Sequence, residues 1–191
     1  MDQTRQYGEG LIGIRPDHLS RYKFAADKIP NGSSVIDAAC GCGYGSWIMW
    51  DSGLNVIGID ISNHAIDYAQ QHYAGPQYIC SSIEAIGNLE ADYLVSFETV
   101  EHLSDPLCLR RINAGHVIAS VPNELRYPFN PEKFKDDEYP HQRHYTPEQF
   151  EQFLNSLDFQ VTEKWCQKDK TGPLSEGDDG LFLIYVGKRN K

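Results

Sequence analysis

The chain has 191 residues, of which 40% are hydrophobic and 23% are charged, and its formal net charge is -10 at pH 7. This length and composition indicate one globular domain, residues 1–191, with a core of ordinary size. The negative charge disfavours binding to nucleic-acid phosphates and to anionic lipid. No apolar run approaches the roughly 20 residues that span a bilayer, and the first residues lack a signal-peptide pattern, so we expect a cytoplasmic protein.

Helix and strand patterns alternate along most of the chain. Apolar residues at helical spacing predict a first helix over 17–29, within an N-terminal cap segment of residues 1–32. Short apolar runs predict five strands, and helical patterns lie between several of them. The strands are expected at 35–39, 56–59, 77–80, 91–97 and 115–121, with helices at about 46–52 and 62–74 and a short helical link before the fifth strand. This alternation predicts a Rossmann-like α/β fold with a mostly parallel sheet flanked by helices.

The last third of the chain carries a lid candidate, one helix and two more strands. Thr146-Pro147-Glu148-Gln149 is a capping box with proline at the first helical position, so a helix should begin there. Strands expected at 160–165 and 181–186 would form an antiparallel hairpin and bring the sheet to seven strands. The segment 123–146 is too long and irregular for a turn, and we interpret it as a lid on the substrate side of a ligand site.

A glycine-rich turn follows the first predicted strand. Gly41, Gly43 and Gly45 alternate with other residues there, and Asp60 closes the second strand. Glycines allow a sharp turn and a close approach to a ligand, and an acid on the second strand can accept hydrogen bonds from both ribose hydroxyls. The dinucleotide pattern requires a glycine where this chain has Ser46, so NAD is less favoured than a ligand without a pyrophosphate.

Three segments in succession resemble the motifs of class I S-adenosylmethionine-dependent methyltransferases. They are VIDAACGCGYGS from Val35, IGIDIS from Ile57 and YLVSFETVEHL from Tyr93. The likeness extends to HLSRYKFAADKI from His18, SVPN from Ser120 and HQRHYTPEQF from His141. Within this class the chain is most similar to methyltransferases associated with glycan and polysaccharide biosynthesis.

The resemblance assigns cofactor contacts along the turn and the strand ends. It implies that Asp37 and the turn from Gly41 to Gly43 lie beneath the methionine part of S-adenosylmethionine, while Asp60 holds the ribose. Many relatives have aspartate where this chain has Ser82, and the N–H of Ile83 could contact the adenine instead. The full set of cofactor residues implied is Asp37, Ala39, Gly41, Cys42, Gly43, Asp60, Ile61, Ser82, Ile83, Phe97 and Glu98.

Histidines and acids near the fourth strand are the candidates for catalysis. Glu101, His102 and His141 are the catalytic residues that we expect, with His102 or His141 removing a proton from the acceptor hydroxyl without a metal. The segment Glu98-x-x-Glu101-His102 is also similar to a metal-binding segment of quinone-biosynthesis and small-RNA O-methyltransferases, so a divalent cation held by Glu98, Glu101, His102 and His141 is the alternative. A further interpretation is that Glu101-His102 only orients the turn.

These observations favour methyl transfer to a small polar acceptor that carries a hydroxyl, such as a sugar or nucleotide-sugar. One alternative is a metal-assisted 2'-O-methyltransferase of RNA ends, although the charge and the lack of a basic run make a nucleic-acid partner less favoured. Another alternative is a non-catalytic partner subunit that binds the cofactor.

His18, Arg21 and Tyr22 on the first helix are expected either to close the pocket or to form a solvated face with one buried tyrosine.

Overall fold

The computed structural model describes residue 6 and residues 10–190, so part of the predicted cap segment 1–32 lies outside the described residues. Its centre is one sheet with the strand order β3-β2-β1-β4-β5-β8-β6-β7. The strands are β1 (Ser34–Ala38), β2 (Asn55–Asp60), β3 (Gln77–Cys80), β4 (Leu89–Phe97), β5 (Ile112–Pro122), β6 (Phe159–Gln167), β7 (Ser175–Glu176) and β8 (Phe182–Arg189). The helices are α1 (Pro16–Lys28), α2 (Tyr44–Asp51), α3 (Asn63–His72) and α4 (Pro147–Ser156), with short 3-10 turns η1 (Pro106–Arg111) and η2 (Pro131–Lys133).

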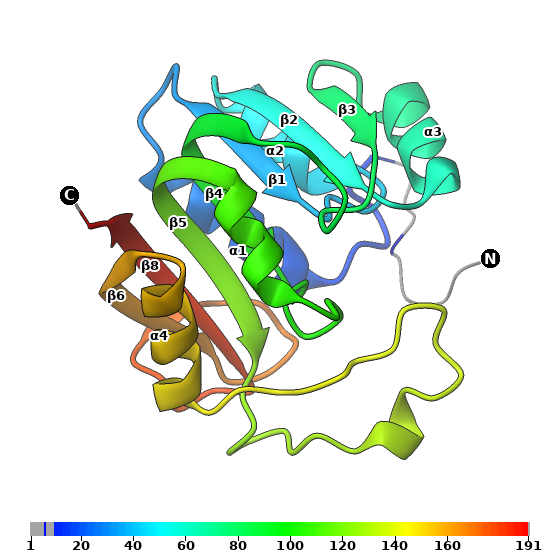
Figure 1. The fold of residues 1–191 in the computed structure, drawn as a ribbon. Helices are drawn as coiled ribbons and strands as arrows, with labels where there is room; N and C mark the ends of the chain where they lie inside the picture. Colours follow the sequence, from blue (N-terminus) through cyan, green and yellow to red (C-terminus); the bar gives the residue numbers. More distant parts are fainter. Residues whose placement is uncertain (1–5, 7–9, 191) are drawn as a thin grey trace.

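The strand directions confirm the predicted Rossmann-like sheet. β3, β2, β1, β4 and β5 are parallel, whereas β8 runs antiparallel to β5 and to β6 (Figure 1). The expected number of seven strands was wrong, because β7 adds an eighth. This strand has two residues and pairs only with Trp165 and Cys166 of β6, and two residues are too few for the alternation by which a strand is recognised in a sequence.

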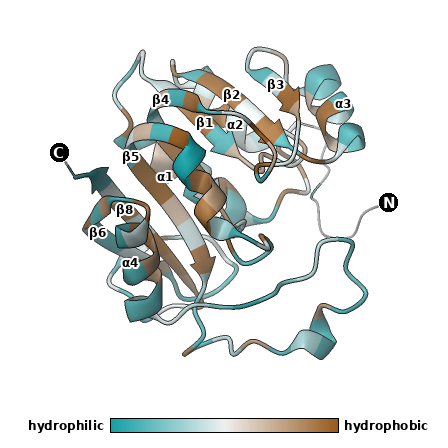
Figure 2. Cartoon of the chain, viewed as in Figure 1, coloured by the Kyte–Doolittle hydropathy of each residue, from teal (hydrophilic) through white to brown (hydrophobic). Residues whose placement is uncertain are grey.

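Alternate side chains of the strands pack against two layers of helices. Val35 of β1 and Ile184 of β8 belong to the core beneath α1 and α2, and Ile36 and Leu183, one residue away in each strand, belong to the core beneath α4 and η1. Figure 2 shows the hydrophobic colour concentrated along the strands. This two-sided burial explains why the parallel strands have nearly continuous apolar sequences.

The carboxyl ends of the parallel strands determine where a ligand can bind. The carboxyl ends of the parallel strands point toward one side of the molecule, where the segment 123–146 runs from β5 to α4 as a long excursion (Figure 1). The capping box at Thr146 is present as predicted, with its hydroxyl oxygen accepting from the N–H of Gln149 and its N–H donating to the Gln149 side chain. α4 therefore begins where the excursion ends.

The third glycine of the turn is required for helix packing. A Cβ at Gly45 would lie 2.1 Å from the ring of Tyr22 on α1, so only glycine lets α1 approach α2 this closely. Gly43 is crowded in the same way from the other side, since its Cβ would lie 2.5 Å from that of Ala69 on α3. The spacing of these glycines thus positions three helices around the turn.

We predict that Gly45→Ala lowers the free energy of unfolding by about 2 kcal/mol or more, because the rigid Tyr22 ring must move. Gly87→Ala is the matched control, since a Cβ there meets nothing within 4 Å, and its effect should stay within about 0.5 kcal/mol. Urea unfolding of both variants measures the difference. Equal stability of the two variants would contradict the packing argument.

Candidate active site

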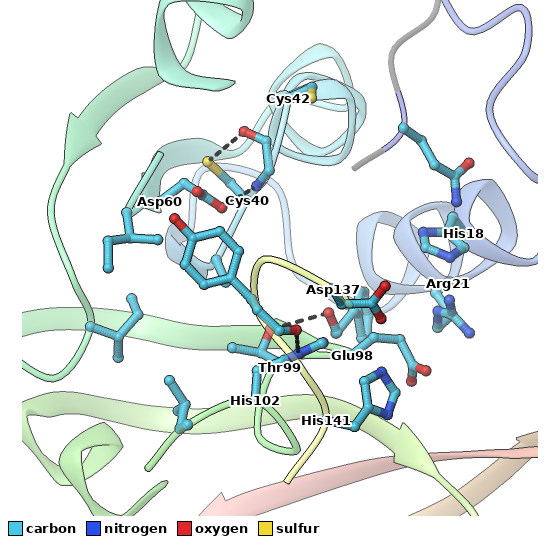
Figure 3. A pocket seen from close by; sticks show the side chains of 18 of the residues that line it. His18, Arg21, Cys40, Cys42, Asp60, Glu98, Thr99, His102, Asp137 and His141 are labelled. Atoms are coloured by element: carbon cyan, nitrogen blue, oxygen red, sulfur yellow. Dashed lines mark hydrogen bonds between the residues drawn. The ribbon is translucent and has the colours of Figure 1, made fainter. Parts of the chain in front are cut away.

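A cavity of about 490 Å³ opens at the carboxyl ends of β1, β2 and β4, which is where open α/β sheets bind their ligands. α1 contributes to one wall and the lid segment 123–146 to another. Figure 3 looks into it, with Asp60 on one side and His18 and Arg21 on the opposite side. Nine of the predicted cofactor residues line this cavity, namely Ala39, Gly41, Cys42, Asp60, Ile61, Ser82, Ile83, Phe97 and Glu98.

Asp60 holds the glycine-rich turn in position. One carboxylate oxygen accepts a hydrogen bond from the N–H of Gly41 at 2.9 Å, and the other accepts from the N–H of Ser62, also at 2.9 Å. The side chain is only 3% exposed, although it lines the cavity. The carboxylate therefore joins the end of β2 to the turn after β1, and Ile61, Ser82 and Ile83 line the cavity beside it.

Asp37 lies behind the cavity. It is fully buried on the α1 and α2 side of β1, where the Tyr22 hydroxyl donates to one oxygen at 3.2 Å and the Ser46 hydroxyl to the other at 2.6 Å. Burial raises the pKa of this carboxyl to about 7, against the lowering effect of the two hydroxyls. Asp37 and Gly43 are the two predicted cofactor residues that do not line the cavity, and both connect the turn to the surrounding helices.

A buried arginine faces the cavity from α1. Arg21 is 1% exposed, and one terminal nitrogen donates to the Oε1 of Gln167 at 2.6 Å. Its other terminal nitrogen, Nη2, lies 3.7 Å from a carboxylate oxygen of Asp17, and neither Nη2 nor Nε makes a hydrogen bond. The guanidinium also lies 5.0 Å from the centroid of the Phe182 ring. Buried donors without acceptors are costly, so they favour an anionic ligand at this point.

The groups around Arg21 differ in charge. Burial, together with the nearby Arg21, lowers the pKa of His18 to about 2, so this imidazole is neutral, and its Nδ1 lies 2.9 Å from the Tyr44 hydroxyl. Glu98 accepts a hydrogen bond from the Ser120 hydroxyl at 2.7 Å. Burial raises the pKa of Glu98, and the Arg21 guanidinium opposes that shift. A cation and a carboxyl group thus occupy the same end of the cavity.

The three predicted catalytic residues lie close together, next to the end of the cavity that holds Arg21 and Glu98. Glu101, His102 and His141 each place one ligand atom within 4.8 Å of the others. The two histidines line the cavity, whereas Glu101 is fully buried beside it and neither of its carboxylate oxygens has a hydrogen-bond partner. Burial raises the pKa of Glu101 well above its usual range, and the charge of Glu98 raises it further.

Glu98 lies apart from this group, so the four-residue metal set expected from the sequence stays a prediction. Within the described part of the chain, only the other three form a group that could hold a metal ion. The reason is backbone geometry, since Glu98 has a positive φ of 50° and its side chain reaches Ser120 on β5. The segment therefore does not bring both carboxylates to one point.

Hydrogen bonds from the lid bring His141 to the other two residues. The N–H of Gln142 donates to the carbonyl of Glu101 at 2.8 Å, and its side-chain amide donates to the carbonyl of His102 at 3.0 Å. The Nδ1 of His102 lies 2.7 Å from the carbonyl of Tyr139. A carbonyl can only accept, so this Nδ1 carries a proton, and in the neutral ring the lone pair is on Nε2.

Several lining residues gave no signal in the sequence. Phe182 and Lys170 line the cavity from the C-terminal third of the chain, and Gln167 supports Arg21 from β6. They reach the site because β8 returns beside β5 and places the tail next to α1. No local pattern encodes such a long-range contact. Arg21, in contrast, was a candidate for closing the pocket, and it lies in the cavity wall together with His18 and Tyr22.

The sequence and the fold are similar to those of known proteins. A family model described as a methyltransferase domain matches residues 14–164. The ubiquinone biosynthesis O-methyltransferase of Coxiella burnetii is 32% identical over 103 residues, which are 49% of this chain and 44% of the relative. The chain spans less than half the length of the curated relatives that it matches.

Two solved structures share the fold. An S-adenosylmethionine-dependent methyltransferase from Thermotoga maritima, a possible histamine N-methyltransferase, has a TM-score of 0.72 at 16% identity and aligns over 91% of this chain and 89% of its own. Magnesium protoporphyrin IX methyltransferase from Synechocystis, solved with bound S-adenosylmethionine, has a TM-score of 0.64 at 16% identity over 91% and 78% of the two chains.

No helix among the described residues combines the length and the apolar character that crossing a membrane requires.

The family model spans most of the sequence, including β1 to β5 and α4. The chain therefore belongs to the methyltransferase-domain family, and it has the fold of solved S-adenosylmethionine-dependent methyltransferases.

Proposed function

We propose that this protein transfers the methyl group of S-adenosylmethionine to a hydroxyl of a small polar acceptor, such as a sugar or nucleotide-sugar. The observation that carries the proposal is the position of His102 and His141 in the same cavity as Asp60 and the glycine-rich turn. A cofactor held by the turn and a proton acceptor in the same enclosed space are the two requirements for methyl transfer to oxygen.

The cofactor would lie across the floor of the cavity. Asp60 would accept hydrogen bonds from the ribose hydroxyls, and Ile61, Ser82 and Ile83 would surround the adenine. The methionine end would then lie against α1, where its carboxylate meets Arg21 and its ammonium meets Glu98. The two guanidinium nitrogens of Arg21 that lack hydrogen-bond partners, Nε and Nη2, support this orientation, because the carboxylate would supply their missing acceptor.

The reaction itself is an in-line displacement at the methyl carbon. The acceptor oxygen forms a bond to that carbon as the carbon–sulfur bond breaks, and the electron pair of the broken bond returns to sulfur, which becomes a neutral thioether. The hydroxyl proton passes to the Nε2 of His102, whose Nδ1 proton is held by the Tyr139 carbonyl. We assign the base role to His102 rather than to His141, because burial and the neighbouring His102 lower the pKa of His141 to about 3 and make it a weak proton acceptor.

The lid forms the side of the cavity on which the methyl acceptor would bind. Tyr127, Phe134 and Tyr139 bring aromatic rings to the cavity, and Asp137 brings a carboxylate. Aromatic faces suit the apolar face of a ring-shaped acceptor, and a carboxylate can accept hydrogen bonds from its other hydroxyls. The volume of about 490 Å³ must hold the cofactor as well as the acceptor, which supports a small acceptor.

A metal-assisted version of the same reaction is the second candidate. The residues fit a divalent cation, since Glu101 offers a buried carboxylate without hydrogen-bond partners within 4.8 Å of nitrogen atoms of His102 and His141. A cation bound there would lower the pKa of the acceptor hydroxyl. The 2'-hydroxyl of an RNA end would suit this version, although the net charge of -10 disfavours phosphate contacts.

We predict that Arg21→Met weakens binding of S-adenosylhomocysteine by about 10- to 100-fold, the usual cost of a buried charged hydrogen bond. Binding of 5'-methylthioadenosine, which lacks the amino-acid part, should change little. Calorimetric titration of both ligands gives the comparison. If the variant loses the same affinity for both ligands, Arg21 supports the fold of the pocket rather than the carboxylate.

We predict that His102→Asn lowers the rate of methyl transfer by about 100-fold or more, as expected for loss of a general base, and leaves the affinity for S-adenosylhomocysteine unchanged. His72→Asn, on the exposed end of α3, is the matched control. The assay uses a panel of sugars, nucleotide-sugars and short RNA ends. Full activity of His102→Asn would exclude the proposed base.

The same assay decides between the two versions of the mechanism. If base catalysis operates alone, addition and removal of a chelator leaves the rate unchanged. Loss of activity with chelator, restored by a divalent cation, would favour the metal-assisted version. A protein that binds the cofactor but methylates no member of the panel would favour a role as a cofactor-binding partner subunit.

A further inference from the structure

Besides His141, the lid contains His144, a buried histidine that the proposed reaction does not use. His144 is 6% exposed and lies near the base of the lid, where Tyr145 donates its N–H to the carbonyl of Pro122 at 3.2 Å. The rings of Tyr127 and Phe129 lie 5.1 and 5.4 Å from its ring, measured between centroids. A buried imidazole has two polar nitrogens, and both need partners.

Both nitrogens of His144 have a partner. Nδ1 lies 2.6 Å from the carbonyl oxygen of Tyr127, and Nε2 lies 2.8 Å from the Nδ1 of His141. The carboxylate of Glu124 lies 3.9 Å from the Nδ1 of His144. The three groups His141, His144 and the Tyr127 carbonyl thus form one continuous chain of hydrogen bonds inside the lid.

The Tyr127 carbonyl determines where the protons of this hydrogen-bonded series lie. It can only accept, so the Nδ1 of His144 must carry a proton. Burial lowers the pKa of His144 and so favours its neutral ring, although the Tyr127 carbonyl and the Glu124 carboxylate oppose that shift. In the neutral ring with its proton on Nδ1, Nε2 can only accept. The Nδ1 of His141 is then the donor, and the lone pair of neutral His141 lies on Nε2.

Without this partner the proton of His141 would be placed differently. A neutral imidazole in water carries its proton mostly on Nε2, which is the reverse of the arrangement found here. The ring of Phe134 stacks on His141 with centroids 4.0 Å apart and planes at 5°. Stacking fixes the plane of the ring, but it does not distinguish its two nitrogens. The hydrogen bond to His144 does distinguish them.

We propose that His144 is a positioning residue that holds His141 as the Nδ1-protonated tautomer, so that the lone pair His141 offers to the Glu101 and His102 cluster is on Nε2. This inference rests on the proposed function for its effect on catalysis, but the tautomer can be observed without any reaction. His102 has the same arrangement through the Tyr139 carbonyl. The lid therefore sets the tautomer of both histidines by backbone carbonyls, directly in one case and through His144 in the other.

The test is the nitrogen NMR spectrum of the full-length protein labelled with ¹⁵N-histidine, with His141→Gln and His144→Gln used for assignment. In the wild type we expect His141 and His144 to show protonated Nδ1 and unprotonated Nε2. His144→Phe keeps an aromatic ring in the pocket but removes both hydrogen bonds, and we expect the His141 signals to move toward the Nε2-protonated form. A wild-type spectrum with protonated Nε2 on His141 would overturn the proposal even if His144→Phe did not fold.

Kinetics then test the catalytic consequence. His144→Phe should lower kcat by about tenfold or more with an unchanged KM for the cofactor, because the ring of His141 lies 4.5 Å from that of the proposed base His102, between centroids, and a changed tautomer alters the polar contact offered there. Partners that orient metal-ligating histidines have effects in this range. His144→Gln has both a donor and an acceptor, so it should restore the His141 tautomer and most of kcat. A changed tautomer with an unchanged kcat would overturn the positioning role. If the wild type transfers no methyl group, the proposed function fails, and the spectra still decide whether His144 sets the tautomer.

Discussion

The carboxylate of Asp60 joins the two strands on which the cavity depends. Its oxygens accept hydrogen bonds from the backbone N–H groups of Gly41 and Ser62, one in the turn after β1 and one at the start of α3. Charged hydrogen bonds of this kind are shorter and stronger than neutral ones. The turn is thereby held open at the carboxyl end of the sheet, and the glycines within it let α1, α2 and α3 pack closely around it.

The cavity is assembled from parts that lie far apart in the sequence. One end combines Arg21 from α1 with Glu98 after β4, and the opposite side is formed by Asp60 and Ile61. The lid then docks on the turn after β4 through Gln142, which brings His141 beside His102. Cofactor and acceptor would thus enter one space from two sides. This arrangement suits a reaction in which two ligands must be aligned before a bond forms.

Much of the fold could be predicted because its signals are local. The apolar strands, the glycine-rich turn, Asp60 at the end of β2 and the capping box of α4 each follow from a short stretch of sequence, and each is present. The two-residue β7 was missed because it has no periodicity, and it forms only by pairing with β6. The strand number was therefore wrong by one.

The site was predictable where a residue follows directly from a strand end, and less so elsewhere. Asp37 lies in the strand where a cofactor contact was predicted, but strand alternation turns its side chain toward Tyr22 and Ser46. Glu98 lies apart from the group formed by Glu101, His102 and His141, and no residue pattern reveals its positive φ. The contribution of Phe182 depends on the return of β8 beside β5, a contact set by the whole sheet.

The central claim is that the cavity binds an adenosyl sulfonium whose ribose is held by Asp60. Calorimetric titration of S-adenosylmethionine and NAD into the wild type, Asp60→Ala and the exposed control Asp67→Ala tests it most directly. We expect the wild type and the control to bind S-adenosylmethionine and not NAD, and Asp60→Ala to lose affinity by about 30-fold or more. Equal binding of NAD, or undiminished binding by Asp60→Ala, would contradict the account.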